Sequence, residues 1–332
     1  MNAQPGPQSG GIPPVPPRWT VLIGSRSFGQ LFPEHITELE RAGCAVVPNP
    51  IGRALNENEL LRALDGVDAI ITGTDELTAR VIESASQLKT IVKHGVGLET
   101  IDLAAARARG IVVSFTPGTI HDSVADLTMA LLLALARKIV PAHLSTRLGS
   151  WKPFFGMELR DATLGLVGLG RIGQAVCVRA RAFGMGVLAC DPYPNEGFAA
   201  EHDVTFVSLA ELLKASDVVS LHAAAEQVPG ALIGHDELRL MKPGALLINT
   251  ARGQLVDEAA LAAALRDNRL GGAGIDAFVN EPPVGSPLLG LDNVVLTPHL
   301  GGRTQGGQRR MGEMAIENCL RALRGEMPLY AV

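Results

Sequence analysis

Short apolar runs alternate with longer amphipathic stretches through most of the chain. Runs rich in valine, isoleucine and threonine predict strands, and the first five lie at residues 20–23, 45–47, 69–71, 90–92 and 111–113. Apolar positions with helical spacing lie between them, for example at residues 56–64 and 78–86. A strand followed by a helix, repeated several times, predicts a parallel sheet with helices on both of its faces.

A second series of the same kind follows a long apolar helix, which the pattern predicts from about residue 122 to 144. A helix is expected at 171–183, and strands at 163–167, 186–189, 217–221, 245–249, 274–276 and 294–296. The last helical pattern, at 307–324, has no strand partner, so we expect it to pack back on the first domain. The predicted fold class is α/β, with two parallel-sheet domains.

Length and the N-terminal composition agree with this organisation. A chain of 332 residues corresponds to about two domains. Residues 1–17 contain six prolines and three glycines but no apolar core. This composition predicts a disordered tail rather than a signal peptide.

Charge and cysteine usage exclude several classes of protein. The net charge of −5 argues against a nucleic-acid partner, because such a surface needs clustered Lys and Arg. The apolar stretch at residues 129–136 is far too short to span a bilayer. Cys44, Cys177, Cys190 and Cys319 occur singly, which is typical of buried thiols in a reducing compartment. We therefore expect a cytoplasmic protein with no metal and no membrane contact.

The first motif that carries chemistry is a glycine-rich turn. Gly168, Gly170 and Gly173 form GxGxxG directly after a predicted strand and at the start of a predicted helix. In dinucleotide-binding units these glycines allow the tight turn, the approach of a pyrophosphate and close helix packing. Arg171 and Ile172 lie within the motif, at the helix N-terminus that attracts phosphate. An ordinary strand–helix crossover is the alternative interpretation.

An acidic residue at the end of the next strand supports the dinucleotide interpretation. Asp191 lies 23 residues after Gly168 (191 − 168), close to the spacing of about 20 expected for a ribose-binding carboxylate. Residues 192–200 contain no Lys or Arg that could neutralise a 2′-phosphate. The sequence therefore favours NAD over NADP.

A second set of polar residues follows later predicted strands: Arg252, Asp276, Glu281 and His299. Ligands of open α/β sheets bind outside the carboxyl ends of the strands, so we expect these side chains to converge. Arg252 offers a planar set of donors for a carboxylate or keto oxygen. His299 can transfer a proton near neutral pH, and a neighbouring Glu281 would raise its pKa. Taken singly, each has an ordinary explanation: a loop histidine, a surface arginine and a structural ion pair.

Together these segments resemble the D-isomer-specific 2-hydroxyacid dehydrogenase family, and its phosphoglycerate dehydrogenase-like branch in particular. The resemblance runs from about residue 60 to 320, through the strings HGVGLETID, SVADLT, LGLVGLGRIG, INTARGQLVDEAAL, GIDAFVNEPP and TPHLGG. It implies a flavodoxin-like substrate domain at residues 18–116 and 300–332. A Rossmann NAD-binding domain at 117–299 would be inserted into it.

The resemblance also implies roles for individual residues. Arg252, Glu281 and His299 would be the catalytic set, and Asp276 would hold the nicotinamide carboxamide. The loop Gly95-Val96-Gly97 would offer backbone amides to the substrate carboxylate, with Arg252 as a second contact. His222, Thr250 and Ala251 complete the expected cofactor contacts. The helix with SVADLT would lie at the interface of a homodimer.

The chain departs from the family pattern at several positions. Glu99 and Thr100 replace an Asp-Asn pair, Phe115 replaces an Asn, and Arg303 replaces a small residue. The segment that starts at His222 lacks the usual proline, so His222 could be a simple strand-end histidine. None of these changes removes a group of the catalytic set, but the first two make the substrate uncertain.

The alternatives concern both substrate and class. A formate dehydrogenase-like enzyme would have Gln in place of Glu281, and an NAD-sensing corepressor would have longer extensions than the short proline-rich tail. A true 3-phosphoglycerate dehydrogenase would place an Arg on the turn after the third strand, whereas residues 72–76 contain Asp75 and Glu76. Lys93 is the nearest cation in the sequence. We therefore expect a small 2-hydroxy or 2-keto acid as the substrate.

Overall fold

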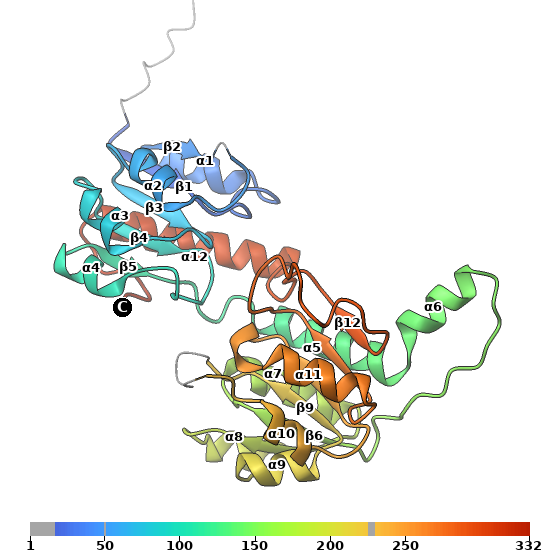
Figure 1. The fold of residues 1–332 in the computed structure, drawn as a ribbon. Coiled ribbons are helices and arrows are strands. Elements are labelled where there is room, and N and C mark those ends of the chain that lie inside the picture. Colours follow the sequence, from blue (N-terminus) through green and yellow to red (C-terminus); the bar gives the residue numbers. More distant parts are fainter. Residues whose placement is uncertain (1–16, 50, 225–229) are drawn as a thin grey trace, which may run out of the picture. The chain divides into compact units, whose positions relative to one another are not determined.

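The computed structural model describes residues 17–49, 51–224 and 230–332. The chain forms two compact units: unit 1 runs to Pro117 and resumes at Gln308–Val332, and unit 2 is Gly118–Gly307. Residues 1–16 lie outside the described residues, so the disordered tail stays a prediction. Parallel sheets with helices on both faces build each unit (Figure 1).

Unit 1 contains a sheet of parallel strands in the order β2-β1-β3-β4-β5. The strands are β1 (Trp19–Ile23), β2 (Cys44–Pro48), β3 (Ala69–Thr72), β4 (Thr90–Lys93) and β5 (Val112–Ser114). The helices are α1 (Glu34–Arg41), α2 (Glu57–Ala63), α3 (Ala79–Ser84), α4 (Leu103–Ala108) and α12 (Gln305–Leu323).

Alternating side chains of the unit 1 strands enter two different cores. Leu22 and Ile70 face the core built with α2, α3 and α4, whereas Val21 and Ile71 face the core built with α1 and α12. Such alternation follows from the two-residue period of a strand. The last predicted helix, at residues 307–324, corresponds to α12. It covers one face of the unit 1 sheet, as expected.

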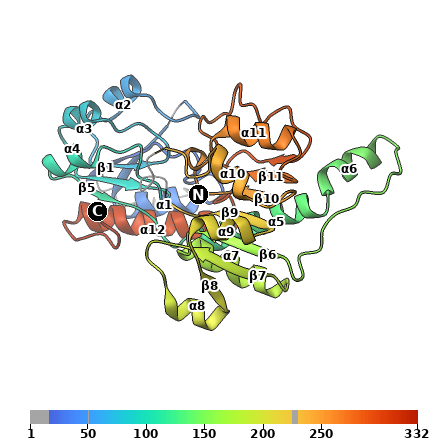
Figure 2. The ribbon, with the colours of Figure 1, turned by 60° about the horizontal axis from the view of Figure 1, so that its bottom comes forward.

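Unit 2 contains a longer parallel sheet in the order β12-β11-β10-β9-β6-β7-β8. Its strands are β6 (Thr163–Val167), β7 (Gly186–Cys190), β8 (Val204–Phe206), β9 (Val218–Leu221), β10 (Leu246–Asn249), β11 (Gly272–Ile275) and β12 (Val294–Leu296). The direction of winding reverses between β6 and β9, which makes the carboxyl ends of these strands the expected ligand crevice. The predicted α/β class is confirmed. The short edge strand β8 was not predicted, and it lies with α8 (Glu196–His202) at one side of the sheet (Figure 2).

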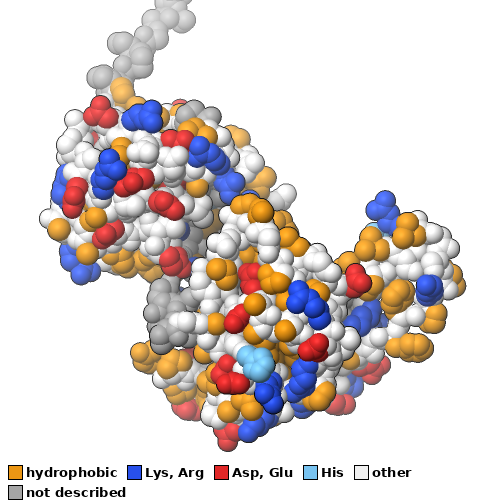
Figure 3. Space-filling model, viewed as in Figure 1, with side chains coloured by type: hydrophobic (Ala, Val, Ile, Leu, Met, Phe, Trp, Pro, Cys, Tyr) orange, Lys and Arg blue, Asp and Glu red, His pale blue; other side chains and the backbone are white. Residues whose placement is uncertain are grey.

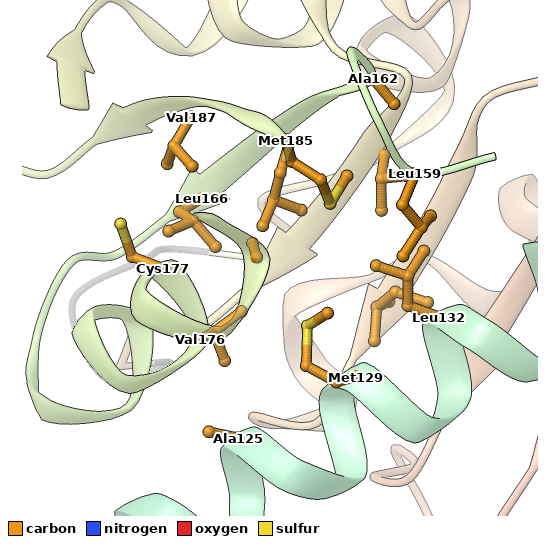
Figure 4. Close-up of a cluster of buried hydrophobic side chains, with 14 of the residues drawn as sticks. Ala125, Met129, Leu132, Leu159, Ala162, Leu166, Val176, Cys177, Met185 and Val187 are labelled. Carbon is orange, nitrogen blue, oxygen red and sulfur yellow. The ribbon is translucent and has the colours of Figure 1, made fainter. Parts of the chain in front are cut away.

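Helices cover both faces of the unit 2 sheet. One face carries α5 (His121–Ala136) and α7 (Arg171–Ala182), and the other carries α9 (Leu209–Ala215), α10 (His235–Leu240) and α11 (Glu258–Arg266). Met129 and Leu132 of α5 point into the same cluster as Val176 of α7 and Leu166 of β6 (Figure 4). This packing fixes the start of α7, and therefore the glycine-rich turn, against the sheet.

The long helix expected at 122–144 is in fact two helices. α5 ends at Ala136, and α6 (Ile139–Arg147) begins after Lys138, which has a left-handed backbone (φ 52°). The reason is Pro141, which cannot continue a helix but fits the first turn of a new one. None of the helices in the described residues is long and apolar enough to cross a membrane.

The second boundary between the units falls after Gly307 rather than after residue 299. Residues 300–304 stay with unit 2 because its side chains hold them: Asp276 accepts hydrogen bonds from the amides of Leu300 and Gly301. The hydroxyls of Ser123 and Thr304 are hydrogen-bonded at 2.6 Å. The TPHLGG segment is therefore one structural piece with the sheet that carries Asp276.

Candidate active site

The glycine-rich turn lies between β6 and α7, at the reversal point of the unit 2 sheet. A side chain at Gly168 (φ 96°) would collide with the backbone of His222, and one at Gly173 would collide with the carbonyl of Gly168. A Cβ at Gly170, by contrast, would meet no atom of the described residues within 4 Å. The outer glycines are thus required by packing, while the middle one leaves open space beside the helix.

This open space suits a pyrophosphate. α7 has twelve residues, and among the described residues no side-chain hydrogen bond caps its N-terminus, where Gly170 is the N-cap. Free amides and the helix dipole attract an anion at such a position. The residues of the turn therefore fit a dinucleotide, with Arg171 and Ile172 supplying the first amides of the helix.

Asp191 follows β7, and its carboxylate is oriented by two backbone amides. Oδ2 accepts a hydrogen bond from Leu169 N at 2.6 Å, and Oδ1 accepts one from Tyr193 N at 2.8 Å. Each carboxylate oxygen can accept a second bond. Because Leu169 belongs to the glycine-rich turn, this geometry ties the acidic group to the predicted pyrophosphate site.

Asp276, at the end of β11, anchors the turn that carries His299. It is almost fully buried, and its carboxylate accepts hydrogen bonds from Thr297 Oγ1, Leu300 N and Gly301 N at 2.6–2.9 Å. His299 N donates to the carbonyl of Asp276, and His299 itself has a left-handed backbone (φ 53°). This conformation is uncommon for a non-glycine residue. The sequence did not reveal that Asp276 holds the residues on both sides of His299.

Glu281 and His299 form a close pair. Nδ1 of His299 lies 2.8 Å from both carboxylate oxygens of Glu281, and Oε1 also accepts a hydrogen bond from Phe278 N. The hydrogen bond that His299 donates to Glu281 raises the pKa of His299 above its ordinary value, although burial opposes the shift. Burial alone would raise the pKa of Glu281, but its bonds to His299 and the nearby charges keep that pKa below the ordinary value. The pair therefore favours a protonated imidazole.

Arg252 follows β10 and begins the tight turn Gly253–Leu255. Asn249 holds this turn, because its side chain donates to the carbonyl of Arg252 and accepts from Ala251 N. A Cβ at Gly253 would lie about 2 Å from the backbone of Phe278 and Val279, so only glycine lets the two loops meet. The charge of Arg252 acts on both Glu281 and His299. Gly253 is thus a residue of the site that the sequence reasoning did not select.

The remaining cofactor candidates of unit 2 surround these loops. His222 follows β9, and its Nε2 is hydrogen-bonded to Ser220 Oγ at 2.9 Å. Burial lowers the pKa of His222 to about 4, so the ring is neutral, and its Nδ1 has no partner among the described residues. Thr250 is buried and hydrogen-bonded to Thr128 of α5. Thr250 therefore helps to fix the end of β10 before Arg252.

The loop Gly95-Val96-Gly97 belongs to unit 1, at the end of β4. Thr116 Oγ1 is hydrogen-bonded to the nitrogen and to the carbonyl oxygen of Gly95, both at 3.0 Å, and Gly95 has φ 151°. Just before this loop, Nδ1 of the buried His94 is 3.0 Å from Ser25 Oγ. Burial lowers the pKa of His94 to about 3.

The turn after β3 differs from its sequence interpretation. Asp75 is fully buried and accepts hydrogen bonds from Thr72 Oγ1 and from the amides of Leu55 and Gly73. The carboxylate of Asp75 therefore stabilises the turn through these hydrogen bonds and is not exposed to a ligand. Lys93 points to this turn, where its ammonium donates to the carbonyl of Gly73.

Two of the departures from the family pattern have structural uses. The amide and carbonyl of Phe115 bond to Tyr330 and Asn318, so Phe115 attaches the C-terminal segment to unit 1. Arg303 is exposed, and its Nε donates to the carbonyl of His299 at 3.2 Å. Thr100 accepts a hydrogen bond from Leu77 N at 2.8 Å, through its carbonyl and not its side chain.

Residues 129–301 match the model of the NAD binding domain of D-isomer specific 2-hydroxyacid dehydrogenases. The chain belongs to this family. As a member, it is an NAD-dependent dehydrogenase of 2-hydroxy acids, which confirms the family and the cofactor predicted from the sequence motifs.

Two relatives of this dehydrogenase carry different names. It is 42% identical over 279 residues to a glyoxylate reductase of Thermococcus litoralis, covering 81% of this chain and 84% of the relative. It is also 42% identical over 282 residues to a D-3-phosphoglycerate dehydrogenase of Methanocaldococcus jannaschii, covering 83% of this chain. The chain spans only 54% of that second relative, about half its length.

A solved structure supports the same placement. The D-lactate dehydrogenase of Aquifex aeolicus, crystallised with NAD and lactic acid, superposes with a TM-score of 0.81 at 29% sequence identity. The match covers 92% of this dehydrogenase and 96% of that chain.

Proposed function

We propose that the dehydrogenase interconverts a short 2-keto acid and its D-2-hydroxy acid, with His299 as the acid and base. The observation that carries this proposal is the pairing of His299. Glu281 holds Nδ1 with both carboxylate oxygens, while Nε2 has no hydrogen-bond partner among the described residues and the side chain is 49% exposed. The pair therefore favours the charged form of the ring and orients it, and Nε2 is the atom that would meet a substrate.

The roles of the neighbouring groups follow from their chemistry. Bound NADH supplies the hydride that adds to C2 of the keto acid. His299 would donate its Nε2 proton to the carbonyl oxygen as the new hydroxyl forms, and in the oxidation it would take the proton back. Arg252 would bind the keto oxygen or the carboxylate with its planar guanidinium. The amides of Gly95, Val96 and Gly97 would bind the carboxylate, and Asp276 would orient the nicotinamide amide.

We further propose that Asp191 selects NAD over NADP. Its carboxylate would accept bonds from the ribose hydroxyls, whereas a 2′-phosphate would be repelled at short range. We expect kcat/KM with NADH to exceed that with NADPH by at least about tenfold, since one close like-charge contact costs more than 1.4 kcal/mol in a partly desolvated site. Steady-state kinetics with both cofactors measure the ratio.

Two variants test the assignment to this residue. Asp191→Ala should lower the ratio of kcat/KM with NADH to kcat/KM with NADPH. Glu196→Ala, which removes an exposed carboxylate of α8, should leave this ratio unchanged. Equal efficiencies of NADH and NADPH with the wild-type enzyme would refute the proposal.

The proposed substrate has a small or uncharged group on C2. The turn after β3 exposes Glu76 and contains no Lys or Arg at residues 72–76. Lys93 is buried, and its ammonium donates to the carbonyl of Gly73. A dianionic phosphate would lack a charge-assisted partner there. The glyoxylate reductase relative is also matched over most of its length, unlike the 3-phosphoglycerate dehydrogenase relative.

Steady-state kinetics on a short panel of keto acids test the proposed function. We expect a higher kcat/KM with glyoxylate or hydroxypyruvate than with 3-phosphohydroxypyruvate, by about tenfold or more if one charge-assisted pair is missing. The highest kcat/KM on the phosphorylated compound would instead establish a 3-phosphoglycerate dehydrogenase.

We also propose that the enzyme is a homodimer, with the interface on an arm formed by residues 138–156. The SVADLT segment offers little surface, because Ser123, Val124, Ala125 and Thr128 are buried in unit 2 itself. The arm, in contrast, has no buried residue in α6. It exposes Ile139, Val140, Leu144, Leu148, Trp151, Phe154 and Phe155. In Figure 3 hydrophobic side chains gather on the extension that carries α6, between Lys and Arg side chains.

Exposed apolar area of this extent typically marks a protein interface. Both ends of the arm are fixed at one point, because Met157 N donates to the carbonyl of Ala136 and Gly156 packs against the same carbonyl. We expect sedimentation to show a dimer that dissociates in the variant Leu148→Ser/Trp151→Ser/Phe155→Ser. Val178→Ser, at an exposed apolar residue outside the arm, is the control. A monomeric wild-type enzyme would contradict the proposal.

A further inference from the structure

Glu258 holds both ends of the loop that carries Glu281. One carboxylate oxygen, Oε1, accepts a hydrogen bond from Val279 N at 3.1 Å, and the other, Oε2, accepts one from Ser286 Oγ at 2.5 Å. These two partners lie on either side of Glu281 in the sequence. A single side chain therefore spans the loop.

This contact is not explained by the helix on which Glu258 stands. Glu258 is the first residue of α11, but Asp257 caps that helix by accepting from the amides of Ala259 and Ala260. The carboxylate of Glu258 is thus available for the loop. The backbone of Glu258 is held in place, because Leu261 and Leu265 of the same helix pack in the core.

Packing does little to hold the middle of the loop. A cavity of about 390 Å³ lies between the loop and the start of α11, lined by residues 256–259, 279–280 and 283–287. Val279 is 45% and Val284 is 85% exposed. Side chains that fill no core stabilise a loop weakly, so its position depends on hydrogen bonds across the cavity.

We propose that Glu258 is a positioning residue, which fixes the loop so that both oxygens of Glu281 meet Nδ1 of His299. This inference rests on the proposed roles of Glu281 and His299. It adds a residue that contacts neither the substrate nor the cofactor and that acts only through Glu281. The groups that act on His299 are Glu281, Asp276 and Arg252; Asp276 and Arg252 are held by other contacts, so the loss of Glu258 should change the influence of Glu281 alone.

The test compares pH profiles of hydroxy-acid oxidation, which needs neutral His299. Glu281→Gln removes the group that raises the pKa of His299, so the acid limb of the profile should move to lower pH. Glu258→Ala should move that limb in the same direction and lower kcat by about tenfold, because a small displacement of a catalytic group has effects of this size. Ser286→Ala, which removes one of the two bonds, should give a smaller shift.

Two comparisons separate positioning from a general structural effect. Glu258→Gln keeps an oxygen acceptor for Val279 N and an amide for Ser286, so it should largely restore the wild-type profile. Glu211→Ala removes a glutamate that likewise accepts from a serine hydroxyl and a backbone amide in the first turn of α9. It should leave both the profile and the affinity for NADH unchanged.

The double variant Glu258→Ala/Glu281→Gln should behave like Glu281→Gln alone, because Glu258 acts through Glu281. Hydrogen exchange at residues 279–286 should also accelerate in Glu258→Ala, whatever the chemistry of the site. A wild-type profile in Glu258→Ala, additive shifts in the double variant or unchanged exchange would each overturn the inference. A Glu281→Gln profile without a shift, together with faster exchange in Glu258→Ala, would instead refute the proposed role of Glu281 and leave the positioning of the loop intact.

Discussion

Replacing His299 with alanine should lower kcat for keto-acid reduction by about 10²- to 10⁴-fold, the usual contribution of a positioned acid–base group. The dissociation constant of NADH should change little, because the proton is transferred only during turnover. The pH dependence of the wild-type enzyme should follow the same residue. Since Glu281 raises the pKa of His299, reduction should lose rate as pH rises through that pKa, and oxidation should lose rate as pH falls through it.

A matched control is available in the same unit. His235 on α10 is 70% exposed, and His235→Ala should leave both kcat and the pH profile unchanged. Near-native kcat in His299→Ala would show that the pair with Glu281 is structural, which is the ordinary explanation for a loop histidine.

Replacing Arg252 with alanine should lower kcat/KM by about 10- to 10²-fold, because a charge-assisted pair contributes about 1.5–3 kcal/mol. Unlike in His299→Ala, both KM and kcat should change. KM should rise because the substrate carboxylate loses its partner, and kcat should fall because the developing oxyanion loses the positive charge of Arg252. Steady-state kinetics with one keto acid measure both.

Arg252→Lys is the informative comparison. Lysine keeps the charge but not the planar fork, so it should recover only part of the lost kcat/KM. Full recovery would show that Arg252 supplies charge without geometry, and an unchanged kcat/KM in Arg252→Ala would remove the residue from the site.

The fold could be predicted because its signals are local. The apolar run at Thr163–Val167, the glycines after it and the spacing to Asp191 all lie within one short segment of the sequence. The observed β6 has the predicted bounds. The prediction was wrong where one residue outweighed a long pattern. The helix that ends at Ala136 continues as an apolar pattern, but Pro141 and the left-handed Lys138 divide it.

The site was predictable only in part, since its geometry depends on contacts distant in sequence. Arg252 and His299 could be placed at strand ends, but the hydrogen bonds of Asp276 to the His299 turn depend on three-dimensional register. The close approach at Gly253 and the bonds of Glu258 are equally invisible in a pattern of apolar and polar residues. Asp75 shows the reverse error: the sequence analysis counted its carboxylate among the groups facing a phosphate, although the side chain is fully buried and hydrogen-bonded within the turn.

The identity of the product tests the central claim most directly. Wild-type enzyme would be incubated with NADH and hydroxypyruvate, and the resulting glycerate would be resolved by chiral chromatography while NADH consumption is followed. The proposed function predicts D-glycerate formed in equimolar amount to the NADH consumed. Formation of the L isomer, or no oxidation of NADH with hydroxypyruvate, glyoxylate or any other short 2-keto acid, would contradict it.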